Sequence, residues 1–145
     1  MTSFKKTLYA VISGIILSLG WYPWGSGLFL LIGFVPLLLV EENISGESGR
    51  RKGQKVFLYA SVTFITWNAA ATWWIFNASF VGMVAAFVVT TLFMTIPFWL
   101  YSFTKRNMGR RAGYISLILF WLAYEFAYTH GEISWPWLTL GNGFL

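Results

Sequence analysis

The sequence predicts an all-α fold, a polytopic membrane helical bundle of about five transmembrane helices with its N-terminus in the cytoplasm. Two observations carry this prediction. The 145 residues are 57% hydrophobic and only 10% charged, whereas a soluble domain is about 45–50% apolar and about 25% charged. The charges also fall in short clusters, and none lies between Lys6 and Glu41 or between Lys55 and Lys105. These gaps are long enough to cross a bilayer.

Each span follows from the length of a gap, since one crossing needs about 20 residues. The first gap holds two short spans, separated at the turn 21–25, whose proline and glycine interrupt a helix. The second gap holds two full spans, separated at the polar residues 77–79. We therefore expect spans near 7–20, 26–40, 56–76, 80–103 and 112–128. The polar segment 41–55 is expected to be a flexible linker.

The orientation follows from the basic residues, which occupy every second connection. They are Lys5, Lys6, Arg50, Arg51, Lys52, Lys55, Lys105, Arg106, Arg110 and Arg111. The positive-inside rule makes that side cytoplasmic, so the aromatic segment 129–145 faces outward. A cleaved signal peptide ending near Gly20 is the alternative for the first span. Topology and anionic headgroups explain the basic clusters, so nucleic-acid binding is not expected.

The tryptophans and one glutamate indicate a candidate substrate site at the outer face. Six of the nine tryptophans fall at the predicted outer boundary: Trp21, Trp24, Trp73, Trp74, Trp135 and Trp137. They form either an interfacial belt that is skewed to one side or an aromatic floor for lipid chains. On the second interpretation, the residues expected to line the site are Trp135, Trp137, Gly141 and Asn142. Glu125, near the outer end of the fifth span, is either a polar anchor of this site or a residue that water reaches.

The residue types present also exclude several chemistries. The chain has no cysteine, so a disulfide, a thiolate metal site and a cysteine nucleophile are excluded within it. His130 is the single histidine and has no cysteine or second histidine with which to form a metal site. We therefore predict no catalytic residue, no metal site and no cofactor in these residues.

Segment 134–142, Ser-Trp-Pro-Trp-Leu-Thr-Leu-Gly-Asn, resembles the F-P-W-L…G-Y/N signature of bacterial apolipoprotein N-acyltransferases, which follows a span that ends in a glutamate. The turn 21–25, Trp-Tyr-Pro-Trp-Gly, resembles that family's proline-rich first hairpin, and 67–75 resembles its third span. The sequence of segment 135–143 is most similar to the same segment in Bacteroidetes-type members of that family. The resemblance covers essentially the whole chain.

The resemblance implies a multi-pass protein of the bacterial inner membrane that takes part in lipoprotein maturation. Such enzymes move an acyl chain from a phospholipid, through a cysteine thioester, to the N-terminal amine of a diacylglyceryl-cysteine lipoprotein. A Glu-Lys-Cys triad in a nitrilase-like domain, which follows the membrane helices, performs the chemistry.

We therefore expect this chain to be the N-terminal transmembrane part, truncated within the signature and inactive alone. Its expected partners are the phospholipid donor, the lipoprotein acceptor and membrane lipids. A small non-enzymatic membrane protein, such as a transporter subunit or scaffold, is the alternative.

Overall fold

The computed structural model describes residues 1–22, 25–77, 79–130 and 138–144. Every element in these ranges is an α-helix or a 3-10 helix, and the ranges contain no strand. The expected all-α class is therefore confirmed for the described part of the chain. The elements are α1 (Ser3–Ser18), η1 (Leu19–Trp21), α2 (Leu28–Gly33), α3 (Val35–Ser45), α4 (Lys52–Thr72), η2 (Trp73–Asn77), α5 (Phe80–Met108), α6 (Arg110–His130) and η4 (Leu140–Phe144).

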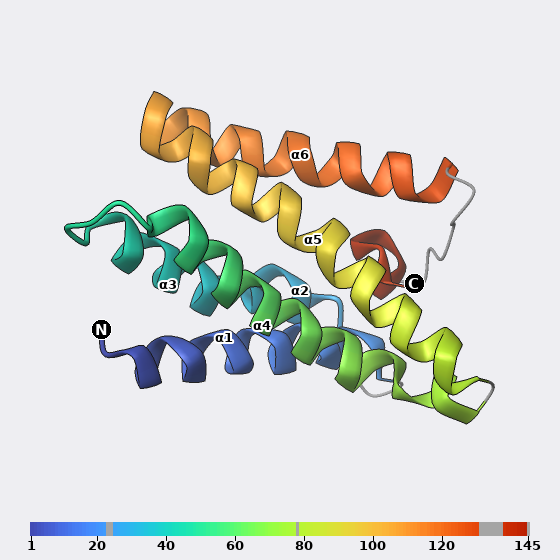
Figure 1. The fold of residues 1–145 in the computed structure, drawn as a ribbon. Helices are drawn as coiled ribbons and strands as arrows, with labels where there is room; N and C mark the ends of the chain where they lie inside the picture. The colour runs from blue at the N-terminus through green and yellow to red at the C-terminus, as the bar shows by residue number, and fades with distance from the viewer. Residues whose placement is uncertain (23–24, 78, 131–137, 145) are drawn as a thin grey trace.

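The long helices pack in the order α1, α4, α5, α6, while α2 and α3 pack against α1 (Figure 1). Close approach of α1 to α4 depends on Gly14, because a Cβ there would lie 2.5 Å from the Thr63 carbonyl oxygen. Small residues allow helices to approach in this way. The Thr63 hydroxyl also donates to the Ala10 carbonyl at 2.9 Å. Gly109 alone joins α5 to α6, and its φ of 91° suits glycine.

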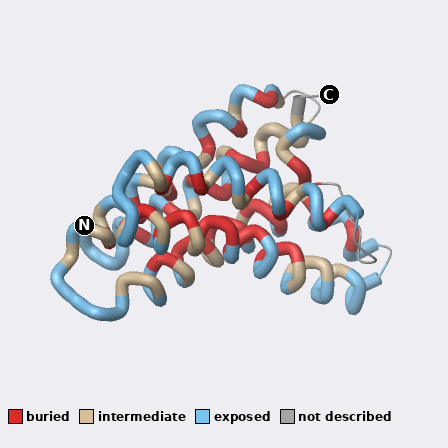
Figure 2. Tube along the Cα trace, turned by 90° about the horizontal axis from the view of Figure 1, so that it is seen from above, coloured by how far each residue is buried: buried red, intermediate tan, exposed pale blue. Residues whose placement is uncertain are grey.

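Aromatic side chains form the centre of the core. Trp67 on α4 is fully buried, with its ring centroid 5.2 Å from that of Trp21 and 6.2 Å from that of Phe64. Phe34, between α2 and α3, packs edge-on against Trp67 at 6.5 Å. Figure 2 shows the buried positions along the inner faces of the helices and the exposed ones along their outer faces. The core thus places the α2–α3 junction beside α4.

The outer faces expose many large apolar side chains, which in a soluble protein would be an aggregation risk. On α6, for example, Ile115, Leu119 and Phe126 are each more than half exposed. Two stretches of the described chain, Leu28–Ser45 and Phe80–Met108, are long and apolar enough to cross a membrane. The composition and these stretches together support a membrane location. The five-span arrangement stays a prediction at this point.

The three basic segments gather at one end of the bundle, at the left of Figure 1. Lys6 of α1 pairs with Glu47 of the α3–α4 connection, and Lys55 Nζ lies 2.5 Å from the same carboxylate. These two hydrogen bonds, first from Lys55 and then from Lys6, lower the pKa of Glu47 to about 2. Lys105, near the end of α5, pairs with Glu41 at 2.5 Å. Basic residues far apart in sequence therefore lie close together.

The prediction that 41–55 is a flexible linker is wrong over most of its length. Helix α3 continues to Ser45 and α4 begins at Lys52, so only 46–51 connects them. The reason is that Leu37, Val40 and Ile44 continue a helical spacing of three to four residues on the buried face of α3. This face carries Glu41 into the interior, where it is 1% exposed.

Candidate functional site

Glu125 lies in the last part of α6 and ties the C-terminal segment of the described chain to that helix. Its Oε1 accepts a hydrogen bond from the Trp121 indole nitrogen at 3.0 Å, one turn earlier on the same helix. The same oxygen accepts from the Leu140 backbone nitrogen at 2.7 Å. Hydrogen bonds to a charged acceptor are stronger than neutral ones, so this carboxylate holds the start of η4 beside α6.

Helix η4 also packs against α2 and η1 on its other side. Gly143 permits this contact, because a Cβ there would lie 2.4 Å from Leu30 Cδ1. The predicted residue Gly141 has open space around its Cβ position, and Asn142, which is exposed, donates its backbone N–H to the Thr139 carbonyl at 3.0 Å. Trp135 and Trp137 lie outside the described residues. Substrate binding by these four residues stays a prediction.

An apolar pocket of about 250 Å³ lies beside the Glu125 contact. Its walls come from the α2–α3 junction, from α6 and from η4, and are formed by Phe34, Leu117, Ile118, Trp121, Leu122 and Leu140. The rings of Phe34 and Trp121 meet edge to face, with centroids 5.0 Å apart. Ile118 and Leu122 are 62% and 59% exposed. The pocket therefore opens on the outer side of α6.

The pocket and Glu125 together make an amphipathic site. Trp121 belongs to both parts, because its ring lines the pocket while its indole N–H bonds to the carboxylate. Its ring is in turn held by Phe64, with centroids 5.7 Å apart, and by Tyr124, at 5.6 Å. An apolar cavity with a few fixed polar groups is the usual form of a small-molecule site, although such cavities measure about 300–1,000 Å³. This one is narrow enough to suit a single hydrocarbon chain.

Glu125, a predicted site residue, is hydrogen-bonded to two residues that line the pocket, but sequence reasoning missed the pocket itself. Its lining residues are ordinary apolar side chains, and Phe34 and Leu140 come from opposite ends of the chain. No local pattern distinguishes such residues from the rest of a hydrophobic sequence. The position of Leu140 depends on contacts between distant segments, among them its hydrogen bond to Glu125 and the packing of η4 against α2 and η1.

A second polar cluster, around Glu41, was also missed. This buried carboxylate accepts hydrogen bonds from Ser45 at 2.7 Å, Ser102 at 2.8 Å and Tyr101 at 3.3 Å, in addition to the ion pair with Lys105. A buried charge is tolerated only with such a set of partners. The cluster joins α3 to α5 and has no described link to the pocket. We interpret it as a structural contact.

The described residues contain no group of three or more histidine, cysteine, aspartate or glutamate side chains that could hold a metal ion. A nucleophilic thiol is excluded throughout, because the chain has no cysteine. What the site can offer is binding: an apolar wall for a hydrocarbon chain and a carboxylate for a polar group beside it.

Comparison with known proteins assigns the chain to a family. The family model described as "Apolipoprotein N-acyltransferase N-terminal domain" matches residues 13–145. A curated relative, the apolipoprotein N-acyltransferase of Chlorobaculum tepidum, is 28% identical over 143 residues. That match covers 95% of this chain and 25% of the relative, so the chain spans about a quarter of the relative's length. No solved structure matches this chain.

Proposed function

Because the chain belongs to the apolipoprotein N-acyltransferase N-terminal domain family, we propose that it is the membrane-embedded part of such an enzyme. In this proposal the complete enzyme transfers an acyl chain from a phospholipid to the N-terminal amine of a diacylglyceryl-cysteine lipoprotein in the bacterial inner membrane. The residues described here bind and orient lipid, and the covalent chemistry belongs to residues outside this chain.

The helix lengths support a five-span arrangement. At 1.5 Å per residue, α1 extends about 24 Å, the α2–α3 stretch about 27 Å, and α4 and α6 about 32 Å each. The hydrocarbon core is about 30 Å thick. The ion pairs that join the basic segments at one end of the bundle agree with a single cytoplasmic face under the positive-inside rule. Glu125 and η4 then lie toward the periplasmic face.

The single observation that carries the functional proposal is the apolar pocket beside Glu125. A phospholipid that approaches α6 from the bilayer meets an opening between Ile118 and Leu122 and can place part of one acyl chain against Phe34 and Trp121. Since the bilayer interior is as apolar as the pocket, the pocket contributes close packing around the chain rather than hydrophobic transfer energy. Glu125 Oε2 has no hydrogen-bond partner among the described residues, so it can accept from a headgroup ammonium. The donor lipid is thereby held in one orientation.

The test fills the pocket without changing charge. In the complete enzyme, Ile118→Trp is expected to raise the KM for the phospholipid donor about tenfold, because the indole occupies the space proposed for the chain. The matched control is Ile115→Trp on the same helix. Ile115 is 60% exposed, close to the 62% of Ile118, but does not line the pocket. Acyl transfer to a diacylglyceryl peptide is measured in mixed micelles.

Membrane abundance and melting temperature of both variants are measured in parallel, so that misfolding is separated from loss of binding. Equal KM values for the two tryptophan variants would show that the pocket does not hold the donor. The small non-enzymatic membrane protein considered above is disfavoured by family membership, and no observation in the structure favours it.

A further inference from the structure

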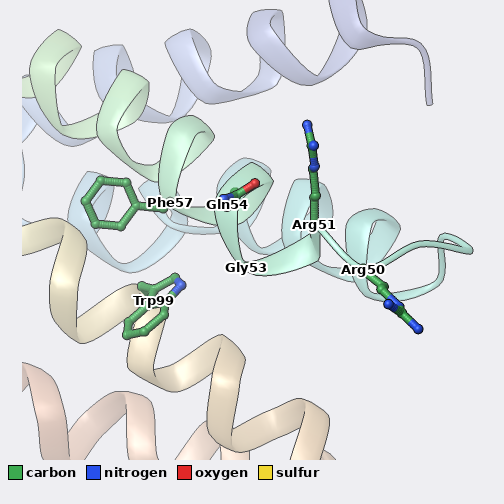
Figure 3. Close-up of a pocket in the computed structure, with 6 residues that line it drawn as sticks. All are labelled: Arg50, Arg51, Gly53, Gln54, Phe57 and Trp99. Atoms are coloured by element: carbon green, nitrogen blue, oxygen red, sulfur yellow. The ribbon is translucent and has the colours of Figure 1, made fainter.

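A second pocket, of about 400 Å³, lies at the basic end of the bundle, away from Glu125 (Figure 3). It is lined by Arg50, Arg51, Gly53, Gln54, Phe57 and Trp99. Figure 3 shows the Phe57 and Trp99 side chains next to each other, while Arg50 and Arg51, which directly precede α4, point in different directions away from them. The pocket thus combines an aromatic wall with two long cationic side chains.

Within the described residues, the arginines at this pocket form no ion pair, whereas Lys6, Lys55 and Lys105 do. The described carboxylates at this end are Glu41, Glu42 and Glu47, and each is occupied by Lys105, Lys6 or Lys55. Among the residues that the structure describes, Arg50 and Arg51 have no ion pair, and neither has Arg106 of α5. Their charge is therefore available to an external anion. Guanidinium groups suit phosphate in particular, because they offer several donors in a planar fork.

Gly53 keeps the pocket open beside two further donors. A Cβ on Gly53 would lie 3.3 Å from the Trp99 indole nitrogen and 3.4 Å from Arg106 Nη2, so both nitrogens are close to the floor of the pocket. The Trp99 indole N–H has no hydrogen-bond partner within the described ranges. A larger side chain at position 53 would fill this space.

The depth of the pocket along α5 fits a lipid headgroup. From Phe80 to Trp99 the helix extends about 30 Å, the thickness of the hydrocarbon core. Trp99 therefore falls at the membrane interface, where tryptophan is enriched, and Arg106 lies about two turns beyond it. Phe103, exposed one turn after Trp99, has its ring 6.3 Å from the indole and continues the aromatic surface.

We propose that this pocket binds the phosphate group of an anionic ligand, either a lipid headgroup in the cytoplasmic leaflet or a soluble phosphate ester. Arg50, Arg51 and Arg106 pair with the phosphate oxygens, the Trp99 indole N–H donates to one of them, and the Phe57 ring covers the carbon atoms next to the ester. The site is separate from the apolar pocket beside Glu125, and binding there does not depend on acyl transfer. It rests only on membrane placement of the basic end.

Binding of phosphatidylglycerol to the detergent-solubilised full chain, measured by native mass spectrometry against phosphatidylcholine, tests the proposal. The double variant Arg50→Gln/Arg51→Gln is expected to weaken phosphatidylglycerol binding at least about tenfold, because both guanidinium groups lose their charge-assisted hydrogen bonds to the phosphate. Lys5→Gln/Arg111→Gln is the control for the loss of two charges, because both residues belong to the same basic end and neither lines the pocket.

A second pair of variants leaves every charge in place. Gly53→Leu fills the pocket and is expected to abolish the preference for phosphatidylglycerol. Gly46→Leu is its control, because a Cβ there would have no neighbour closer than 3.6 Å. Melting temperatures identify any variant that fails to fold. If a glycine variant does not fold, the arginine variants and their control decide the result, and the reverse also holds.

Glycerol 3-phosphate at millimolar concentration distinguishes the two sources of the phosphate. Competition with the lipid would identify a soluble ester as a ligand of the site, and lack of competition would identify the lipid headgroup. Equal phosphatidylglycerol binding by the Arg50/Arg51 double variant and the Lys5/Arg111 double variant, or by Gly53→Leu and Gly46→Leu, would overturn the proposal. Failure of the acyl-transfer test above would leave these results unaffected.

Discussion

Replacing Lys105 by methionine would leave a carboxylate alone in the interior of the bundle. Lys105 Nζ lies 2.5 Å from Glu41, whose side chain is 1% exposed. Methionine keeps most of the volume of the aliphatic stem and removes the cation. The carboxylate would retain only the neutral hydroxyl donors of Ser45, Tyr101 and Ser102.

The expected cost follows from this burial. Breaking a buried ion pair by removing one partner costs about 3–5 kcal/mol. The second partner of Lys105, Glu42, adds little, because its side chain is 49% exposed and exposed pairs contribute about 0–1 kcal/mol. We therefore expect Lys105→Met to lower the free energy of unfolding by about 3–5 kcal/mol. Lys55→Met, which breaks the half-exposed pair with Glu47, should cost less than about 1 kcal/mol.

The assay is unfolding of the full chain by titration with sodium dodecyl sulfate, followed by far-ultraviolet circular dichroism. Adding Glu41→Gln to Lys105→Met should recover about 2 kcal/mol, because the amide oxygen still accepts from Tyr101 and Ser102 while the charge is gone. The reasoning is refuted if Lys105→Met costs no more than Lys55→Met, or if Glu41→Gln adds a further loss.

Three further predictions concern other contacts. Glu125→Ala should speed hydrogen exchange of the Leu140 amide about tenfold or more, because it removes the carboxylate that accepts this bond; unchanged exchange would mean that the bond does not hold η4. Gly14→Ala should lower the free energy of unfolding by about 1–3 kcal/mol through overpacking against α4, whereas Gly46→Ala, with open space, should change it little; similar losses would contradict the close packing. The ordinary pKa of a glutamate is 4.5, and that of Glu47 in the folded chain is about 2. Its ion pairs should therefore contribute their full stability above pH 4.5, and this contribution should disappear as the pH falls toward about 2. The difference in unfolding free energy between wild type and Glu47→Gln should therefore be constant down to about pH 5 and then shrink; a difference that shrinks at higher pH would contradict the shift.

The helical class and the family were predictable from the sequence, and both predictions are confirmed. Gaps between charges are a strong signal because a charge inside a bilayer is costly. The signature at 134–142 identified the family that the comparison assigns. Glu125 was proposed as a site residue on the same grounds, as an ionisable residue in an apolar stretch, and its role stays a prediction.

The boundary of α3 and the two pockets could not be predicted in the same way. The position of charges along the sequence predicted a loop starting at Glu41. It did not show that Lys105, far along the chain, pairs with the buried Glu41 carboxylate. The alternative signal was the helical spacing that continues to Ile44. The pockets depend on contacts between distant segments, such as Gly53 with Trp99, and these contacts leave no pattern in a single sequence.

The short connection at Gly109 between α5 and α6 affects how the apolar pocket beside Glu125 responds to the membrane. Consecutive Cα atoms are 3.8 Å apart, so the adjoining ends of α5 and α6 stay together, and the packing of the two helices along their length couples the tilt of one to that of the other. One wall of the pocket belongs to α6, while Phe34 belongs to the other half of the bundle. Because a span longer than the hydrocarbon core can accommodate by tilting, within the limits that helix packing allows, we expect the mouth of the pocket to change in width when the thickness of the surrounding membrane changes.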